Sequence, residues 1–263
     1  MISIIVPFWN SELWLGRCCQ SLHENEGDFE FILVDDFSDD SGKSIAESYV
    51  KADDRFILLQ NEHKKGVSGA RNTGLDHMRG EWFTFLDADD TLYENAYETL
   101  IKATGISADL YQFNHLRHYE KFDRTVMKYQ TVEGWYDIEH LPSCWCMVWN
   151  KLYRRETFKR VRFVEGLQYG EDEIYNLECF DIEDHHYNNK NPVIVHRFSN
   201  KESLSKTKRK DADGLIAQAR ALEEVLYRLK KPQTRRAVCE VLSEHWTSNT
   251  YLDTFVKKIP NKL

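Results

Sequence analysis

The sequence predicts an α/β protein in which helices flank a mostly parallel β-sheet, and three observations support this fold class. Apolar runs begin near residues 2, 29, 56 and 82, a spacing of about one strand and one helix each. The first run, Ile2–Val6, is almost entirely apolar, as expected for a strand buried on both faces. Amphipathic segments separate the runs, and this alternation is typical of a doubly wound sheet.

Each strand of the first hundred residues is expected to lead into a helix. In the first expected helix, Trp14, Cys18 and Leu22 recur on one face, which is the helical period. Ligands of such sheets bind at the carboxyl ends of the strands, where this sequence concentrates its polar residues. The expected order is strand 2–6, helix 12–23, strand 29–34, helix 43–50, strand 56–59, helix 67–78, strand 82–86 and helix 93–103.

The rest of the chain has a different pattern. Residues 108–200 are less regular and rich in aromatic side chains, including Trp135, Trp145 and Trp149, which suits a ligand-binding half or a second core layer. Farther along, Pro232 predicts a break between two helices. We expect an α/β domain over residues 1–205 and an amphipathic helical region over 206–263, with stripes at Leu215, Ala219, Leu222, Leu226, Leu229 and at Val238, Val241, Leu242, His245, Leu252, Phe255.

Charge is distributed unevenly along the 263 residues, whose net charge is −8. Residues 201–263 carry +6, so the preceding 200 residues carry −14. An acidic body argues against nucleic-acid binding. No stretch approaches the roughly 18 apolar residues of a membrane span, and the N-terminus lacks the features of a secretory signal. We expect a cytoplasmic protein whose C-terminal helices pack on the body; peripheral contact of this basic region with the membrane is the alternative.

The strongest chemical signal is a group of three carboxylates, Asp87, Asp89 and Asp90, directly after an apolar strand. Like charges repel at this spacing unless a cation offsets them. Mg²⁺ or Mn²⁺ is typically held by one or two carboxylates together with substrate phosphates. The spacing Asp87-x-Asp89 lets two carboxylates converge on one metal, although a solvated turn that begins a helix would have the same residues.

Two further segments fall at the same predicted edge of the sheet. Asp35 and Asp36 follow the second strand, and a carboxylate there could accept hydrogen bonds from a nucleobase N–H or ribose hydroxyls. The segment Gly66–Gly74 is rich in small residues and begins a helix, so its backbone could approach a ligand closely, and Arg71 could contact a diphosphate or a base. A turn and an ordinary surface helix are the alternatives for these two segments.

These motifs together resemble family 2 glycosyltransferases of the GT-A fold. Six segments match in the right order over about the first 200 residues, whereas any single one would be weak support. They are Ile4–Asn10, Val34–Ser41, Gly66–Leu75, Gly80–Asp90, Trp149–Glu156 and Gly170–Asp172.

The resemblance implies a metal-dependent hexosyl- or N-acetylhexosaminyltransferase. It would move a sugar with inversion from a nucleotide-diphosphate sugar, a UDP-sugar being favoured, to the hydroxyl of a saccharide or lipid-linked saccharide. The usual setting is bacterial surface polysaccharide or lipo-oligosaccharide biosynthesis. Residues 1–105 would form the nucleotide-sugar-binding half of the catalytic domain and residues 106–205 the acceptor-binding half.

The resemblance also implies roles for individual residues. Asp172 would be the general base. Asp87, Asp89 and His196 would bind Mn²⁺ or Mg²⁺, although His196 could equally be an ordinary strand histidine. The nucleotide contacts would come from Pro7, Phe8, Asn10, Asp36, Arg71, Asp87 and Ala88.

One departure from the family pattern concerns the base pocket. Phe37 stands where the family usually has glycine, so we expect the loop backbone to avoid conformations that favour glycine.

Two other functions compete with the transferase. A sugar-phosphate nucleotidylyltransferase should have a glycine-rich loop after the first strand, where this chain has Pro7–Glu12 without glycine. A non-catalytic nucleotide-sugar-binding protein would have little reason to retain Asp89 and Asp172.

Overall fold

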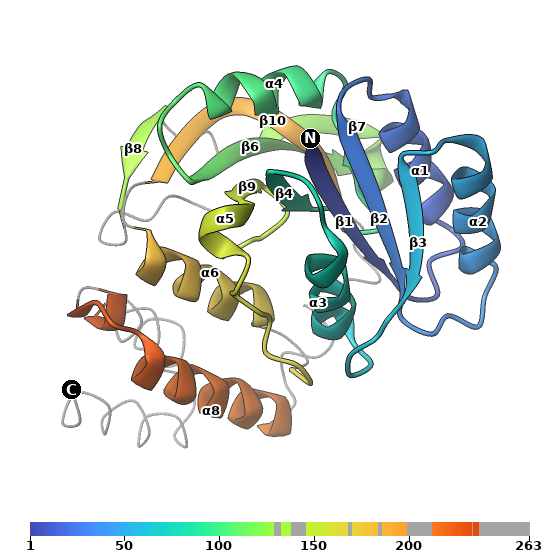
Figure 1. Ribbon diagram of the computed structural model, residues 1–263. Coiled ribbons are helices and arrows are strands. Elements are labelled where there is room, and N and C mark those ends of the chain that lie inside the picture. The colour runs from blue at the N-terminus through green and yellow to red at the C-terminus, as the bar shows by residue number, and fades with distance from the viewer. Residues whose placement is uncertain are drawn as a thin grey trace.

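The computed structural model describes residues 1–128, 133–137, 146–167, 170–183, 186–198, 212–232 and 234–236. These residues build one mixed sheet of ten strands with helices on both faces (Figure 1). The strand order is β3-β2-β1-β4-β9-β6-β10-β5, with β7 paired to β6 and β8 paired to β10. The predicted fold class, a mostly parallel sheet flanked by helices, is confirmed.

The first four predicted strands form the parallel half of the sheet. β1 lies between β2 and β4, and β3 pairs with the far side of β2, all in parallel. All four predicted helices are present, with ends that shift by a few residues. The elements are β1 (Ile2–Phe8), α1 (Leu15–Glu24), β2 (Phe29–Asp35), α2 (Gly42–Ala52), β3 (Phe56–Gln60), α3 (Val67–His77), β4 (Trp82–Phe85) and α4 (Ala96–Thr104).

The second half of the chain extends the same sheet rather than forming a separate layer. β9 is antiparallel to both β4 and β6, so β6 runs in the same direction as β4, and β10 is parallel to β6. The carboxyl ends of β1, β2, β4, β6 and β10 therefore lie at one edge of the sheet. The added elements are β5 (Thr91–Leu92), β6 (Leu110–Tyr119), the 3₁₀ helix η1 (Glu120–Phe122), β7 (Arg124–Lys128), β8 (Gly134–Tyr136), β9 (Lys151–Arg154), α5 (Arg155–Phe158), α6 (Glu171–Ile182) and β10 (His186–Phe198).

Alternating side chains of the buried strands fill two cores, one on each face of the sheet. Ile4 and Val6 of β1 belong to the core that includes residues of α1, α2 and α4. Ile5 points to the opposite core, which is built with residues of α3, α5, α6 and α8 (Ala212–Arg228). A strand with both faces covered explains why β1 is apolar along almost its whole length.

Helix α8 packs against α6 (Figure 1). Leu222, Leu226 and Leu229 of the predicted stripe are buried in the shared core, which confirms packing for this part of the region. The Asp181 carboxylate accepts hydrogen bonds from the backbone N–H groups of Lys230 and Lys231, just beyond the end of α8. The side chains of Leu215 and Ala219, the second predicted stripe and Trp145 lie outside the described residues.

No helix among the residues that the structure describes is both long and apolar enough to cross a membrane.

The close packing of α3 on β1 generates a stability prediction. A Cβ atom added at Gly74 would lie 2.3 Å from Ile5 Cγ2, whereas one added at Gly16 in α1 would meet only Ile45 Cγ2 at 4.0 Å. We expect Gly74→Ala to lower the free energy of unfolding by about 1–3 kcal/mol through overpacking. Gly16→Ala is the matched control and should raise it by up to about 1 kcal/mol through helix propensity. Denaturant titration measures both, and equal effects would contradict the packing described here.

Candidate active site

The predicted polar residues meet at the carboxyl edge of the sheet. Asp36 follows β2, Asp87 follows β4, and β1 lies between these two strands in parallel. His196 lies near the carboxyl end of β10 and reaches Asp90, where its Nδ1 is 3.0 Å from Asp90 Oδ2. The prediction that both aspartate segments share one edge is confirmed.

The predicted contacts on β1 and in the loop after it are positioned in different ways. Pro7 and Phe8 are buried in the strand, so their side chains serve the core, and the Phe8 carbonyl accepts the Asp36 N–H. Asn10 links two loops: its N–H donates to Ser38 Oγ at 3.1 Å, and its Oδ1 accepts the Asp39 N–H at 3.0 Å. These interactions hold the loops after β1 and β2 together.

Trp9 is a residue that the sequence analysis did not single out. Its side chain is 53% exposed at the end of β1, and Lys65 Nζ lies 5.3 Å from the centre of its ring. An aromatic side chain at this edge can stack on a nucleobase, since every base has a π face. The available signal was an aromatic residue directly after a buried strand, in a segment that otherwise matched the family.

The Asp36 carboxylate is hydrogen-bonded to the loop that leads into α3. Its Oδ1 accepts hydrogen bonds from Asn61 Nδ2 at 2.6 Å and from the Gly66 N–H at 3.0 Å. Its Oδ2 accepts the same Gly66 N–H at 2.8 Å, so this oxygen retains a lone pair for one more donor. The carboxylate therefore combines a structural role with the capacity to accept one hydrogen bond from a ligand.

The prediction for Phe37 was wrong. Its φ is 61°, in the left-handed region that the loop was expected to avoid, and Asn10 in the facing loop has φ of 47°. A non-glycine residue in this region costs roughly 1–2 kcal/mol. The hydrogen bonds between the two loops hold the backbone in this shape and offset that cost, so the loop keeps a glycine-like turn without glycine.

The aspartates after β4 carry more negative charge than their described surroundings neutralise. Asp90 is fully buried and accepts hydrogen bonds from the Arg197 N–H at 2.7 Å and from His196. Asp89 is 46% exposed, and partial burial together with the Asp90 and Asp87 charges raises its pKa to about 7. Burial lowers the pKa of His196, but the hydrogen bond to Asp90 and the charges of the three neighbouring aspartates together raise it overall.

The carboxylates of Asp87 and Asp89 fit a divalent cation that takes its remaining ligands from substrate and water. Both are partly exposed, at 33% and 46%, and the pKa of Asp89 is raised by burial and by the neighbouring Asp90 and Asp87 charges, which a bound cation would offset. No group of three or more metal-binding side chains is preassembled among the described residues. The His196 ring stacks on Trp149 at 5.1 Å with its Nδ1 directed to Asp90, which leaves Nε2 as its only free ligand atom. Ala88, between the two carboxylates, is buried in the core.

Arg71 contacts both the aspartate segment after β4 and Asp172, the predicted general base. The residue is 3% exposed, and its Nη2 donates to Asp87 Oδ1 at 3.0 Å. Its Nη1 donates to Asp172 Oδ1 at 2.5 Å and to Glu171 Oε1 at 3.1 Å. Residues from α3, from the end of β4 and from the first turn of α6 thus converge on one guanidinium.

The surroundings of Asp172 suit a proton acceptor. Burial raises the pKa of this carboxyl, and the Glu171 and Asp87 charges add to that effect against the opposing charge of Arg71. The side chain is nevertheless 20% exposed, so a ligand can reach it. A raised pKa brings a carboxylate closer to the operating pH, which improves general-base catalysis.

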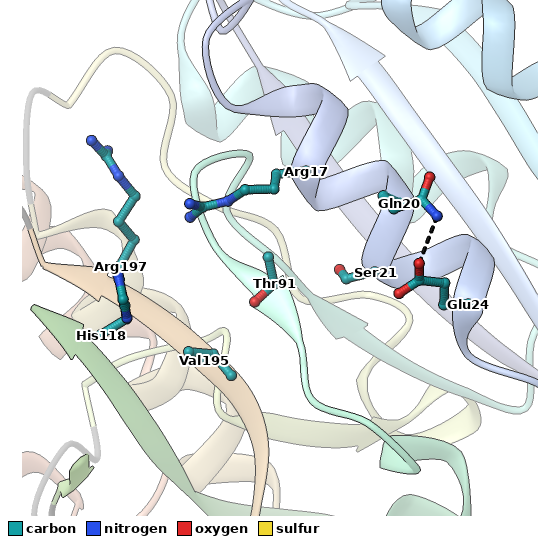
Figure 2. Close-up of a pocket in the computed structure, with 8 residues that line it drawn as sticks. All are labelled: Arg17, Gln20, Ser21, Glu24, Thr91, His118, Val195 and Arg197. Carbon is teal, nitrogen blue, oxygen red and sulfur yellow. Dashed lines mark hydrogen bonds between the residues drawn. The ribbon is translucent and has the colours of Figure 1, made fainter. Parts of the chain in front are cut away.

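A cavity of about 330 Å³ is lined by residues of α1, β5, β6 and β10 (Figure 2). Arg197 links this cavity to the aspartate segment after β4, since its Nη1 lies 3.9 Å from Asp89 Oδ2 and its guanidinium lies over the Trp14 ring. None of the predicted site residues lines this cavity. Its lining residues are Arg17, Gln20, Ser21, Glu24, Thr91, His118, Val195 and Arg197.

Comparisons with known proteins identify relatives of this chain. The chain is similar to glycosyltransferase GlyA of Streptococcus pneumoniae serotype 4, with 30% identity over 195 residues that cover 68% of this chain and 28% of GlyA. It is also similar to a GalNAc(5)-diNAcBac-PP-undecaprenol beta-1,3-glucosyltransferase of Campylobacter jejuni, with 39% identity over 103 residues, 38% of this chain and 33% of that protein. The chain thus spans about a third or less of the length of these two relatives.

The fold is similar to that of residues 1–349 of S. aureus TarS in complex with UDP-GlcNAc. The TM-score is 0.77 at 19% identity, and the match covers 95% of this chain and 74% of the TarS chain. The model of the family described as glycosyl transferase family 2 matches residues 3–169. More than half of the sequence is matched in this way, and the chain therefore belongs to glycosyl transferase family 2, with the GT-A fold.

Proposed function

We propose that this chain transfers a sugar, with inversion, from a UDP-sugar to an acceptor hydroxyl, with Asp172 as the general base. The observation that carries the proposal is the shared guanidinium of Arg71. It holds Asp87, on the donor side, and Asp172 within one cluster at the carboxyl edge of the sheet. A direct displacement on a sugar diphosphate requires a general base and a metal-binding carboxylate close to each other, and Asp172 and Asp87 are the candidates for these two roles.

The loops after β1 and β2 would bind the nucleotide of the donor. Trp9 offers an exposed aromatic face, and Asp36 Oδ2 retains a lone pair for the N3–H of a uracil base. Asp87 and Asp89 would hold the divalent cation, Mn²⁺ or Mg²⁺, which neutralises charge on the departing diphosphate. TarS, which shares the fold, was observed with UDP-GlcNAc, and this supports uracil as the nucleobase of the donor.

The chemical step would be a single displacement at the anomeric carbon. Asp172 accepts the proton of the acceptor hydroxyl as its oxygen bonds to the anomeric carbon, and the bond from that carbon to the diphosphate oxygen breaks. Attack opposite the leaving group inverts the configuration, so an α-linked donor gives a β-linked product. The location of Asp172 in the first turn of α6 favours its ionised form through the helix dipole, which partly offsets burial.

The acceptor would be a saccharide or a lipid-linked saccharide used in bacterial surface polysaccharide biosynthesis. The name of the Campylobacter relative, which contains a diphospho-undecaprenol group, supports a lipid-linked acceptor. Lys230 and Arg236 are exposed just beyond α8 and could contact an anionic membrane surface from which such an acceptor is presented.

The first prediction of the proposed function concerns the general base. Asp172→Asn should reduce kcat by at least about 100-fold, because the amide cannot accept the proton. UDP affinity should change little, since Asp172 does not contact the nucleotide in this proposal. Steady-state kinetics and calorimetric titration with UDP measure the two effects, and wild-type turnover in the variant would exclude Asp172 as the base.

The second prediction concerns pH. Because burial raises the pKa of Asp172, the ionised base becomes more populated as the pH increases through that raised value. We expect kcat/KM to be low in acid and to rise toward alkaline pH. The profile should be measured at saturating metal, so that titration of Asp89 does not contribute. A flat profile from acidic to alkaline pH would contradict the assignment.

The third prediction concerns donor and metal. In a panel of nucleotide sugars, one UDP-sugar should be hydrolysed slowly with Mn²⁺ or Mg²⁺, and chelation should abolish this activity. Binding of UDP without turnover of any donor, even with acceptors supplied, would favour a non-catalytic nucleotide-sugar-binding protein. Formation of a nucleotide sugar from a sugar phosphate and a nucleoside triphosphate would favour a nucleotidylyltransferase.

A further inference from the structure

Arg71 lies beneath the candidate active site rather than in its opening. Its side chain is 4% exposed, and its guanidinium carbon lies 5.2 Å from the centre of the Phe163 ring. Its hydrogen-bonding Nη atoms are directed to carboxylates on two other elements. Three of its five N–H donors are used by those carboxylates, and the burial of the residue limits the access of a ligand to the other two.

A single cation in this cluster faces three carboxylates, those of Asp87, Glu171 and Asp172. Both Nη atoms of Arg71 take part, whereas its buried Nε has no hydrogen-bond partner among the residues that the structure describes. A guanidinium is a planar fork, so its contacts to two carboxylates also define the direction between them. Arg71 therefore sets where Asp172 lies relative to the end of β4.

We propose that Arg71 is a positioning residue that acts on the reaction through Asp172 and does not contact the nucleotide. The competing role, implied by the family resemblance, is direct contact with the nucleotide. The inference rests on the proposed function, in which Asp172 is the general base. Displacing a base by about 1 Å can cost a factor of about 100 in rate, so the loss of this contact should affect turnover more than binding.

Arg71→Lys separates the two roles, because lysine keeps the positive charge but presents its donors from a single nitrogen and cannot reproduce the fixed geometry with which the guanidinium holds Asp87 and Asp172. We expect kcat to fall by about 100-fold while the Kd for UDP, measured with Mn²⁺, stays within about twofold of wild type. A Kd that weakens in proportion to kcat/KM would assign Arg71 to the nucleotide and overturn the proposal. Wild-type kcat in the variant would overturn it as well.

Arg162→Lys is the matched control. Arg162 also bridges to α3, through Nη2 to Asp76 Oδ1 at 2.6 Å, but it does so at the protein surface away from the carboxylate cluster. Its replacement should leave both kcat and the Kd for UDP within about twofold of wild type. Arg71→Gln, which keeps a planar hydrogen-bonding group without the charge, provides a second variant should Arg71→Lys fail to fold. Thermal melting establishes folding for each.

A readout independent of turnover distinguishes failure of this inference from failure of the proposed function. Carbodiimide coupling of an amine to Asp172, followed by peptide mass spectrometry, should be faster in Arg71→Lys than in wild type, because the carboxylate loses its partner. Unchanged labelling would show that Arg71 does not hold Asp172, whatever the activity. Retained turnover in Asp172→Asn would instead refute the proposed function. The labelling result would then still test whether Arg71 holds Asp172.

Discussion

The parallel pairing of β1 with β2 on one side and β4 on the other determines where the functional residues lie. Phe8 is in register with Asp35, and Ile5 with Phe85, so the three strands reach the same edge together. Asp36 and Asp87, each the first or second residue beyond its strand, are brought to that edge by the main-chain pairing of the strands. Because alternate residues of β1 also fill both cores, the register cannot shift by one residue without exposing apolar side chains.

The site combines this rigid support with an unfavourable arrangement of charge. Asp87, Asp89, Asp90 and Asp172 lie within one region, and their described cationic partners are Arg71, Arg197 and His196. Burial and mutual repulsion raise the pKa of Asp89 and of Asp172. Such clustering lowers the stability of the folded state. It suits a site that binds a divalent cation and accepts a proton during the reaction.

Several features of the site could not be predicted from local sequence. Phe37 adopts a left-handed backbone because hydrogen bonds from the facing loop support it, and those bonds join residues about 30 positions apart. Phe8 matched a family segment, yet the inward side of the strand places its side chain in the core. Arg71 contacts Asp87 and Asp172, which lie 16 and 101 residues away in the sequence, and no local pattern indicates those contacts.

The sequence by itself determined the four parallel strands and their helices, the aspartates at the strand ends, and membership of the family. These follow from hydrophobic periodicity and ordered motifs, which depend on neighbours along the chain. Only the tertiary structure decided that β9, β6 and β10 extend the sheet, that His196 meets Asp90, and that Arg71 meets Asp172. The last two pairs are separated by 106 and 101 residues. Contacts at such separations depend on strand order and helix packing, which no local pattern specifies.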